Sequence, residues 1–289
     1  LNQVKKLMER RKNAHKGENG YVLIIGGSED YVGAPALAGL AALRVGCDSV
    51  TIAAPEKVSW AINKLTPDLI TKKFGGAYFT LKHAKELLKL SEKFGSFLLG
   101  NGLSRKADRC CVYLVRKSQR PKVIDADALM PLSFKDPRNS LLTPHFRELE
   151  QLLINSKKDF LLPKLRVANP KEVADILQGN LKYFLQNNNV LMIKGPTDII
   201  ISRNKISLNK TGNPGMTKAG TGDVLAGLAA GFLAKTGDLF KSAVAASYIN
   251  GYVGDLLLKK KKGYSFIASD LVEDLGKIKK ARQIKKRRK

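Results

Sequence analysis

Short apolar segments alternate along the chain with longer segments that have the periodicity of helices. The segments expected to be strands cover residues 21–26, 49–54, 69–74, 96–100, 122–125, 140–142 and 190–194. Helices are expected over residues 33–46, 56–64, 81–94, 107–117, 148–154, 169–186, 224–234 and 239–257. Because buried parallel strands are almost continuously apolar, this alternation predicts an α/β fold, a mostly parallel central sheet with helices on both faces.

Local patterns set several boundaries of these elements. Asn169, Pro170 and Glu172 have the spacing of a helix start, with an N-cap residue, a proline at the first position and a glutamate at the third. Ser269 is expected to cap a last helix that continues into a basic tail. Residues 198–202 and 205–209 predict a hairpin around residues 203–204.

Polar and glycine-rich segments follow five of the predicted strands. They are residues 26–28, 100–102, 125–127, 143–145 and 194–197. Ligands of open α/β sheets bind outside the carboxyl ends of the strands. The sequence therefore predicts that these five segments meet at one binding site.

A glycine-rich stretch over residues 211–227 opens one of the predicted helices. Such a loop lets backbone N–H groups approach an anion, and Asp223, in the first turn, can act as a base beside a phosphate. The alternative is a glycine-rich turn with an aspartate cap. A Walker A loop is excluded because Ala219 follows Lys218, and a dinucleotide fingerprint is excluded because its third glycine is missing after Gly222.

Other candidates each have an ordinary structural alternative. Residues 194–198 suit the phosphates or ribose of a nucleotide, but also a simple turn. His145 can bind a phosphate or a pyridine substituent, or it can cap a helix. Asp125 and Asp127 can hold Mg²⁺ through water, or one of them can cap a helix that begins at Ala128. Residues 33–35 can receive a flat ring or serve close packing of helix on sheet.

Composition narrows the class of protein. The 289 residues show no repeat or linker, which predicts one domain over residues 1–276 and a basic tail over residues 277–289. The net charge of +26 attracts anions, but without interleaved aromatic residues a nucleic-acid partner is the disfavoured alternative. No segment is apolar enough to span a membrane or to act as a secretory signal, and three unpatterned cysteines predict a reduced, cytoplasmic protein.

Taken together over residues 16–275, these motifs resemble the ADP/ATP-dependent NAD(P)H-hydrate dehydratases of the ribokinase-like superfamily. The family's Asp-Ala-Asp-Ala-Leu stands intact at residues 125–129, and its Gly-Asn-Pro-Gly-Met and Gly-Thr-Gly-Asp stand at residues 212–216 and 220–223. Its Gly-Pro-Gly-Leu-Gly is Gly-Asn-Gly-Leu-Ser at residues 100–104. Its Thr-Pro-His-Pro-Gly-Glu is Thr-Pro-His-Phe-Arg-Glu at residues 143–148. Residues 15–17, 33–35, 194–195 and 268–271 match further family motifs.

The resemblance implies a ribokinase-like fold and repair of the hydrates NADHX and NADPHX. ADP or ATP, with Mg²⁺, would phosphorylate the ring hydroxyl, and loss of phosphate would restore NAD(P)H. It assigns the base to Asp223, the catalytic anion hole to the loop that contains Gly220 and Gly222, and the hydrate site to Ala34, Gly102, His145 and Asp223. It assigns the adenine nucleotide to Lys194, Gly195, Pro196, Thr197, Asp198 and Gly222.

The resemblance also implies a homo-oligomer and an epimerase, expected here as a separate protein. The competing hypothesis within the same superfamily is a kinase of a vitamin precursor such as a hydroxymethylpyrimidine, a thiazole or pyridoxal. Residues 212–216 argue against that kinase. A third hypothesis, an inactive relative that only senses nucleotides, is disfavoured by Asp223.

Overall fold

The strands of the computed structural model, which describes residues 2–10 and 13–278, form one nine-stranded sheet. Its order is β3-β2-β1-β4-β5-β6-β7-β8-β9. The strands are β1 Tyr21–Ile25, β2 Ser49–Pro55, β3 Ile70–Phe74, β4 Ser96–Leu99, β5 Lys122–Ile124, β6 Ser140–Leu142, β7 Val190–Ile193, β8 Asp198–Ile201 and β9 Ile206–Asn209. Every strand expected from the apolar segments is present.

The sheet is parallel from β3 to β7 and antiparallel at its far edge. Strand β1 pairs in parallel with β2 on one side and β4 on the other, so the chain order reverses between β1 and β4. Strands β8 and β9 pair antiparallel, as the hairpin prediction requires. In α/β sheets the crevice outside such a reversal is the usual place of ligand binding.

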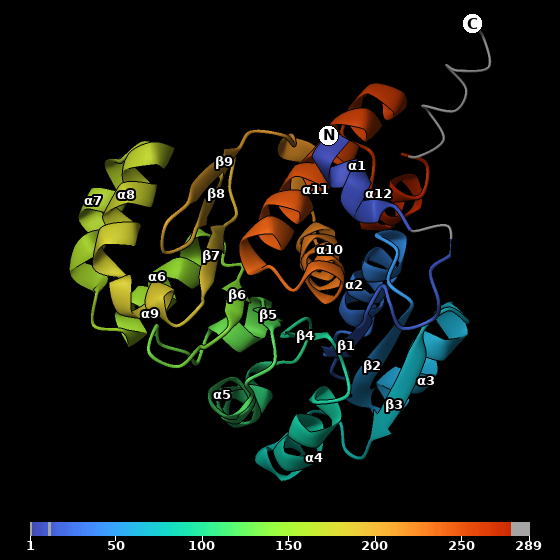
Figure 1. The fold of residues 1–289 in the computed structure, drawn as a ribbon. Coiled ribbons are helices and arrows are strands. Elements are labelled where there is room, and N and C mark those ends of the chain that lie inside the picture. Colours follow the sequence, from blue (N-terminus) through green and yellow to red (C-terminus); the bar gives the residue numbers. More distant parts are fainter. Residues whose placement is uncertain (1, 11–12, 279–289) are drawn as a thin grey trace, which may run out of the picture.

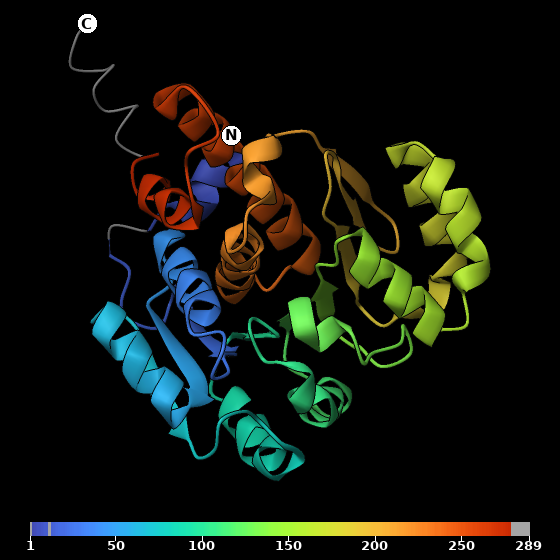
Figure 2. The same cartoon turned by 180° about the vertical axis from the view of Figure 1, so that it is seen from behind.

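Helices cover both faces of the sheet (Figures 1 and 2). They are α1 Asn2–Met8, α2 Gly33–Arg44, α3 Glu56–Leu65, α4 Leu81–Ser91, α5 Asp108–Lys117, α6 Phe146–Asn155, α7 Leu162–Val167, α8 Pro170–Asn180, α9 Lys182–Gln186, α10 Thr221–Thr236, α11 Leu239–Lys261 and α12 Ala268–Leu275. Short 3₁₀ turns lie at Arg105–Ala107, Ala126–Leu129, Asp159–Leu161 and Pro214–Thr217.

Alternate residues of the strands face two separate cores. In β1, Val22 and Ile24 join the core under α1, α2, α3, α10, α11 and α12. Leu23 and Ile25 join the core under α4 to α9. Because successive side chains of a strand point to opposite faces, a strand buried on both sides must be apolar at every position.

The ends of several helices differ from the sequence prediction by up to four residues, and two further differences have a clear cause. The helix expected over residues 169–186 begins at Pro170 as predicted, but it breaks at Leu181 into α8 and α9. Gly179 and Asn180 are weak helix formers at this break. The prediction that Ser269 caps the last helix is wrong, because α12 begins at Ala268 with Ile267 as its N-cap residue, and Asp270 Oδ2 accepts from the N–H of Ile267.

Helix α10 is pressed against α2 by its glycines. A Cβ atom on Gly227 would lie 2.1 Å from the carbonyl oxygen of Ala38, and one on Gly231 would lie 2.5 Å from Val45 Cγ2. The absence of side chains therefore sets how closely the two helices approach. This packing fixes the position of the amino end of α10, where the glycine-rich loop ends.

Within the described residues, no helix is both long and apolar enough to cross a membrane. The predicted basic tail lies outside the description from residue 279 onward, so no structure is assigned to it.

Candidate active site

The amino end of α10 carries the glycine-rich loop and Asp223. Gly220 is the N-cap residue and has a φ of 91°, a left-handed conformation that favours glycine. The first N–H groups of an α-helix have no partners within the helix and carry a partial positive charge. Asp223 is the third residue of α10 and lies in its first turn, as predicted.

Contacts from other elements hold the glycine-rich loop in place. Asp255 Oδ2, on α11, accepts from the N–H of Gly212 at 3.0 Å. Lys218 Nζ donates to the carbonyl oxygen of Phe266 at 2.8 Å and to that of Tyr264. Lys218 therefore ties the glycine-rich loop to the segment before α12.

Asp223 meets Asn101, which follows β4. Asn101 Nδ2 donates to Asp223 Oδ1 at 2.6 Å. Burial raises the pKa of Asp223 to about 6, the hydrogen bond from Asn101 and the charge of Lys194 lower it, and the charge of Asp125 raises it. A carboxylate with a pKa near 6 is ionised at neutral pH and still basic enough to take a proton.

Lys194, at the end of β7, joins two carboxylates. Its Nζ lies 2.8 Å from Asp125 Oδ1 and 3.8 Å from Glu148 Oε2. Burial acts to lower the pKa of Lys194, but Asp125 and Glu148 outweigh it and raise that pKa. A Cβ on Gly222 would lie 3.8 Å from Lys194 Nζ, so the structure brings the lysine and the glycine-rich loop together.

Asp125 is buried, and both of its carboxylate oxygens accept hydrogen bonds. Its Oδ1 also accepts from Thr143 Oγ1 at 2.7 Å, and its Oδ2 accepts from Asn101 Nδ2 at 3.2 Å. Neither aspartate caps a helix that begins at Ala128, so that alternative is wrong: the turn is a 3₁₀ helix from Ala126, and Asp125 makes no cap bond. Asp127 Oδ2 instead accepts from the N–H of Ser104 at 2.9 Å.

His145 is the N-cap residue of α6. Helix capping was the alternative to ligand binding that the sequence left open for this residue. Its Nδ1 accepts from the N–H of Glu148 at 3.2 Å, and Glu148 Oε2 accepts from the N–H of His145 at 2.7 Å. The side chain is 52% exposed, so the ring can also meet a ligand. Phe146 and Arg147, which replace Pro-Gly of the family pattern, form the first positions of α6.

The turn between β7 and β8 contains the remaining residues predicted to bind nucleotide. Asp198 closes the turn, because its Oδ1 accepts from the N–H of Gly195 at 3.0 Å and its Oδ2 from Ser247 Oγ at 2.6 Å. Burial raises the pKa of Asp198. Pro196 is exposed and Thr197 half-buried, and they lie on the rim rather than in the buried network.

Ala34 and Gly102, predicted on the hydrate side, lie together across the reversal point of the sheet. Gly102 has a φ of 70°, and a Cβ on it would lie 3.4 Å from Ala34 Cβ. Ala34 is in the first turn of α2, which follows β1, and Gly102 follows β4. A Cβ on Gly102 would also lie 2.7 Å from Tyr31 Cβ, so Gly102 is packed closely against the segment before α2.

Three residues of the network were given no role by sequence reasoning: Asn101, Thr143 and Glu148. Asn101 and Thr143 stand in segments that follow predicted strands, and Glu148 begins the helix predicted after one of them, so their placement was predictable while their partners were not. Asn101 and Asp223 are 122 positions apart in the chain, and no local pattern links them.

A metal site made of protein side chains alone is not found here. The described residues contain no group of three or more His, Cys, Asp or Glu side chains arranged to hold a metal ion. Asp125, one of the two predicted candidates, already uses both oxygens in hydrogen bonds. The donor set therefore fits Mg²⁺ only as an ion that arrives with nucleotide phosphates and keeps its own waters.

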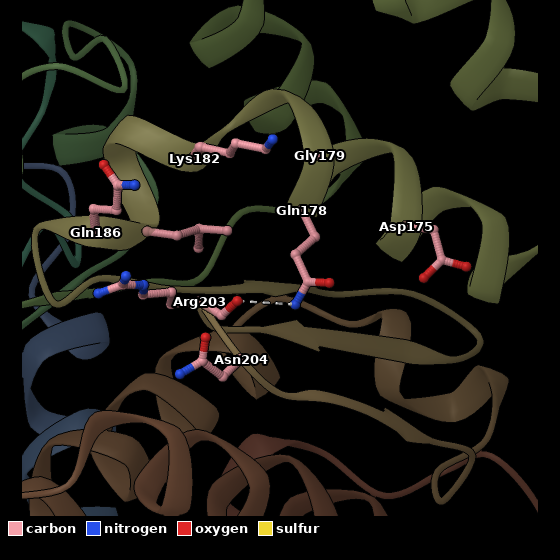
Figure 3. Close-up of a pocket in the computed structure, with 8 residues that line it drawn as sticks. Asp175, Gln178, Gly179, Lys182, Gln186, Arg203 and Asn204 are labelled. Atoms are coloured by element: carbon pink, nitrogen blue, oxygen red, sulfur yellow. Dashed lines mark hydrogen bonds between the residues drawn. The ribbon is translucent and has the colours of Figure 1, made fainter.

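A separate hollow of about 480 Å³ lies between α8, α9 and the turn of the β8–β9 hairpin (Figure 3). It is lined by Asp175, Gln178, Gly179, Lys182, Leu185, Gln186, Arg203 and Asn204. None of the predicted site residues lines it, and Gln178 closes one side through a bond from Nε2 to the carbonyl oxygen of Ser202 at 2.9 Å.

The chain is similar in sequence to known NAD(P)H-hydrate dehydratases. A family model described as NAD(P)H-hydrate dehydratase matches residues 22–277. The chain is 34% identical over 277 residues to the ADP-dependent (S)-NAD(P)H-hydrate dehydratase of Cenarchaeum symbiosum, covering 94% of this chain and 92% of that protein. It is 38% identical to the bifunctional NAD(P)H-hydrate repair enzyme of Methanothermobacter thermautotrophicus, over 93% of this chain and 51% of that protein. The chain thus spans about half the length of the bifunctional relatives it matches.

Solved structures agree with the fold. The ADP/ATP-dependent NAD(P)H-hydrate dehydratase of Bacillus subtilis, co-crystallised with ATP and Mg²⁺, superposes with a TM-score of 0.79 at 26% identity over 96% of each chain. Ribokinase of Thermotoga maritima matches with a TM-score of 0.55 at 14% identity, over 89% of this chain and 99% of that one, a likeness of fold alone. The sheet is therefore the ribokinase-like fold that the resemblance implied.

Proposed function

The chain belongs to the NAD(P)H-hydrate dehydratase family, and we propose that it restores NAD(P)H from its (S)-hydrate with ADP or ATP as phosphoryl donor. The observation that carries the proposal is the placement of Asp223. It is a half-buried carboxylate at the amino end of α10, with a pKa of about 6, next to a loop suited to bind phosphate.

The reaction would proceed in two stages. Asp223 would take the proton of the ring hydroxyl as that oxygen attacks the terminal phosphorus, and the shortened nucleotide would leave with the electron pair of the broken P–O bond. The C–O bond would then break with its electron pair on phosphate, and the neighbouring ring carbon would lose a proton. The N–H groups of the loop, from Ala219 to Gly222, would stabilise the phosphoryl charge during transfer.

Geometry supports the assignment of a hydrate side and a nucleotide side. Ala34, Gly102 and His145 lie around the reversal point and the amino end of α6. Lys194, Gly195 and Asp198 lie in the turn that joins β7 to β8, and Lys194 Nζ lies 3.8 Å from the position of a Cβ on Gly222. The terminal phosphate of a nucleotide bound along that turn would be directed towards Asp223.

The test is an absorbance assay in the band of reduced nicotinamide. NADHX or NADPHX is mixed with the protein, Mg²⁺ and either ADP or ATP. A rise that requires nucleotide supports the proposal and identifies the donor. No rise with either nucleotide, together with phosphorylation of a hydroxymethylpyrimidine, thiazole or pyridoxal substrate, would overturn it in favour of a vitamin kinase.

The proposed function also implies a metal ion, an oligomeric state and a second enzyme. Mg²⁺ would accompany the nucleotide, copies of the chain would form a homo-oligomer, and an epimerase would supply the (S)-hydrate. The described cysteines, Cys47, Cys110 and Cys111, are all free and buried, which suits a reducing cytoplasm. Gel filtration with light scattering tests the oligomer directly.

A further inference from the structure

Asn101 lies completely buried at the reversal point of the sheet. Its backbone carbonyl oxygen accepts from the N–H of Gly27 at 2.9 Å, and this bond joins the segments after β1 and β4. Its side chain points into the carboxylate network. No reaction step described so far uses this side chain.

One amide nitrogen of Asn101 serves two carboxylates. Nδ2 donates to Asp223 Oδ1 at 2.6 Å and to Asp125 Oδ2 at 3.2 Å. An amide NH₂ group has two hydrogens, so each carboxylate receives one. The opposite rotation of the amide would place its oxygen against two carboxylates, and the observed orientation is therefore the only favourable one.

The same orientation leaves the other end of the amide without a partner. Asn101 Oδ1 is buried and, among the described residues, has no hydrogen-bond donor. A buried acceptor without a donor is a net penalty to folding. Such local penalties are retained most readily where a side chain serves a site rather than stability.

We propose that Asn101 is a positioning residue that fixes the carboxylate of Asp223 for proton transfer and connects it through Asp125 to Lys194. This inference rests on the proposed function. The bond to Oδ1 leaves Asp223 Oδ2 without a hydrogen-bond partner among the described residues. That oxygen is free to receive the proton of the substrate.

The charges around Asp223 make the role of Asn101 measurable. Asp125 and Asp127, from the turn after β5, raise the pKa of Asp223, and Lys194, from β7, lowers it. Asn101 lowers it through its hydrogen bond. Replacement of Asn101 by an apolar residue removes a bond that favours the ionised carboxylate, so Asp223 should become harder to ionise.

The experiment is a titration of carboxyl carbons by NMR in the full chain, with ¹³C-labelled aspartate. The Asp223 resonance is identified by its loss in Asp223→Asn. In Asn101→Ala, and in Asn101→Leu, which refills the volume, the pKa of Asp223 should rise by about one unit. An unchanged pKa of Asp223 in both variants would overturn the inference.

The kinetic counterpart is the pH profile of kcat. The acidic limb should move to higher pH by the same amount as the pKa in Asn101→Ala, while the KM for ADP changes little. A uniform loss of kcat at every pH would point to a merely structural role and would contradict the proposal. If the unaltered protein does not turn over NADHX, the proposed function fails, whereas the NMR titration still tests the link from Asn101 to Asp223.

A matched control is Asn155→Ala at the end of α6. Asn155 Nδ2 also donates to two oxygens, the carbonyls of Met130 at 2.9 Å and Leu132 at 2.8 Å. Its loss should lower stability without moving the pKa of Asp223 or the acidic limb. A shift in this control equal to that in Asn101→Ala would show that the effect is not specific to Asn101.

Discussion

Asp223 combines a reactive position with an unfavourable environment for its charge. Replacement by Asn keeps the shape and an acceptor for Asn101 but removes the base. Turnover in Asp223→Asn should fall by about 10³-fold or more, with nucleotide binding retained. Stopped-flow or steady-state assays and nucleotide titration by calorimetry measure the two effects, and near-normal turnover would contradict the assigned role.

The same substitution should stabilise the protein. Because burial raises the pKa of Asp223 from 3.8 to about 6, the ionised form is disfavoured in the folded state above pH 6, and the penalty disappears as the pH falls towards 4. Asp223→Asn should therefore gain about 1–3 kcal/mol in free energy of unfolding at pH 8 and almost nothing at pH 4. Denaturant unfolding at both pH values tests this difference.

The contacts of individual residues were predictable from the sequence only where both partners lie in one stretch of chain. The loop and the carboxylate of Asp223 lie in one stretch of chain, so their proximity followed from the glycines and the helix start. The bonds of Asn101 and Thr143 to Asp125 join different strands, and only the sheet order brings them together. For His145, the sequence left capping and ligand binding equally open, and the structure adds the cap.

At the scale of elements, two substitutions at the amino end of α6 distinguish the capping role of His145 from ligand binding by its ring. His145→Ala removes the cap and should destabilise the protein by about 1 kcal/mol. His145→Asn retains a capping side chain and should restore most of that stability. If the ring contacts the hydrate, both variants should raise the KM for the hydrate more than that for ADP. A KM restored by Asn would contradict such a contact.

The contact of α10 with α2 gives a prediction about helix packing. In Gly227→Ala the new methyl group would meet the carbonyl oxygen of Ala38, so α10 must shift and stability should fall by about 2–3 kcal/mol or more. Turnover should fall as well, because α10 carries Asp223. The control is Gly179→Ala in α8, where a Cβ meets nothing within 4 Å and stability should rise slightly. Equal effects in the two variants would refute the packing argument.

Element types followed from the alternation of apolar segments, and the errors lie at helix ends and in two short helices that were not predicted. The break at Leu181 and the start of α12 depend on which residue supplies the last or first backbone bond. Helix α7 was not predicted, because six residues without a repeating apolar face carry little periodic signal. Helix α1 was not predicted either, although Val4, Leu7 and Met8 have helical spacing.

At the scale of the whole molecule, the amino end of the central strand β5, opposite the carboxyl ends that carry the site, contains a buried cation. Lys122 begins β5, and its Nζ donates to the carbonyl oxygens of Ser118, Arg120 and Arg138 at 3.1, 3.1 and 2.7 Å. Burial lowers the pKa of Lys122 to about 7. Because the Lys122 ammonium group has no part in the proposed reaction, its titration should affect only the free energy of unfolding.

The free energy of unfolding should depend on pH through Lys122. Its pKa is lower in the folded state than the 10.5 of the unfolded chain, so unfolding takes up a proton between pH 7 and 10. Stability should therefore rise with pH across this window, by about 2–4 kcal/mol from this group. Lys122→Met should remove that slope. Parallel curves for the two proteins in urea unfolding at pH 7, 8 and 9 would contradict the prediction.

The overall architecture was the most predictable level. A mostly parallel sheet with helices on both faces follows from the strand pattern, and the ribokinase-like fold followed from the resemblance. The order of the strands, with its reversal between β1 and β4, could not be obtained from apolar periodicity, because periodicity does not tell which strands are neighbours.

The bonds from Lys218 to the carbonyls of Tyr264 and Phe266 link two parts of the chain that are distant in sequence. Local opening of the segment before α12 would release the glycine-rich loop at the same moment. Backbone amides of residues 212–220 and 268–275 should therefore exchange with deuterium as one cooperative unit, and Lys218→Ala should let the loop exchange faster while α12 keeps its own rate.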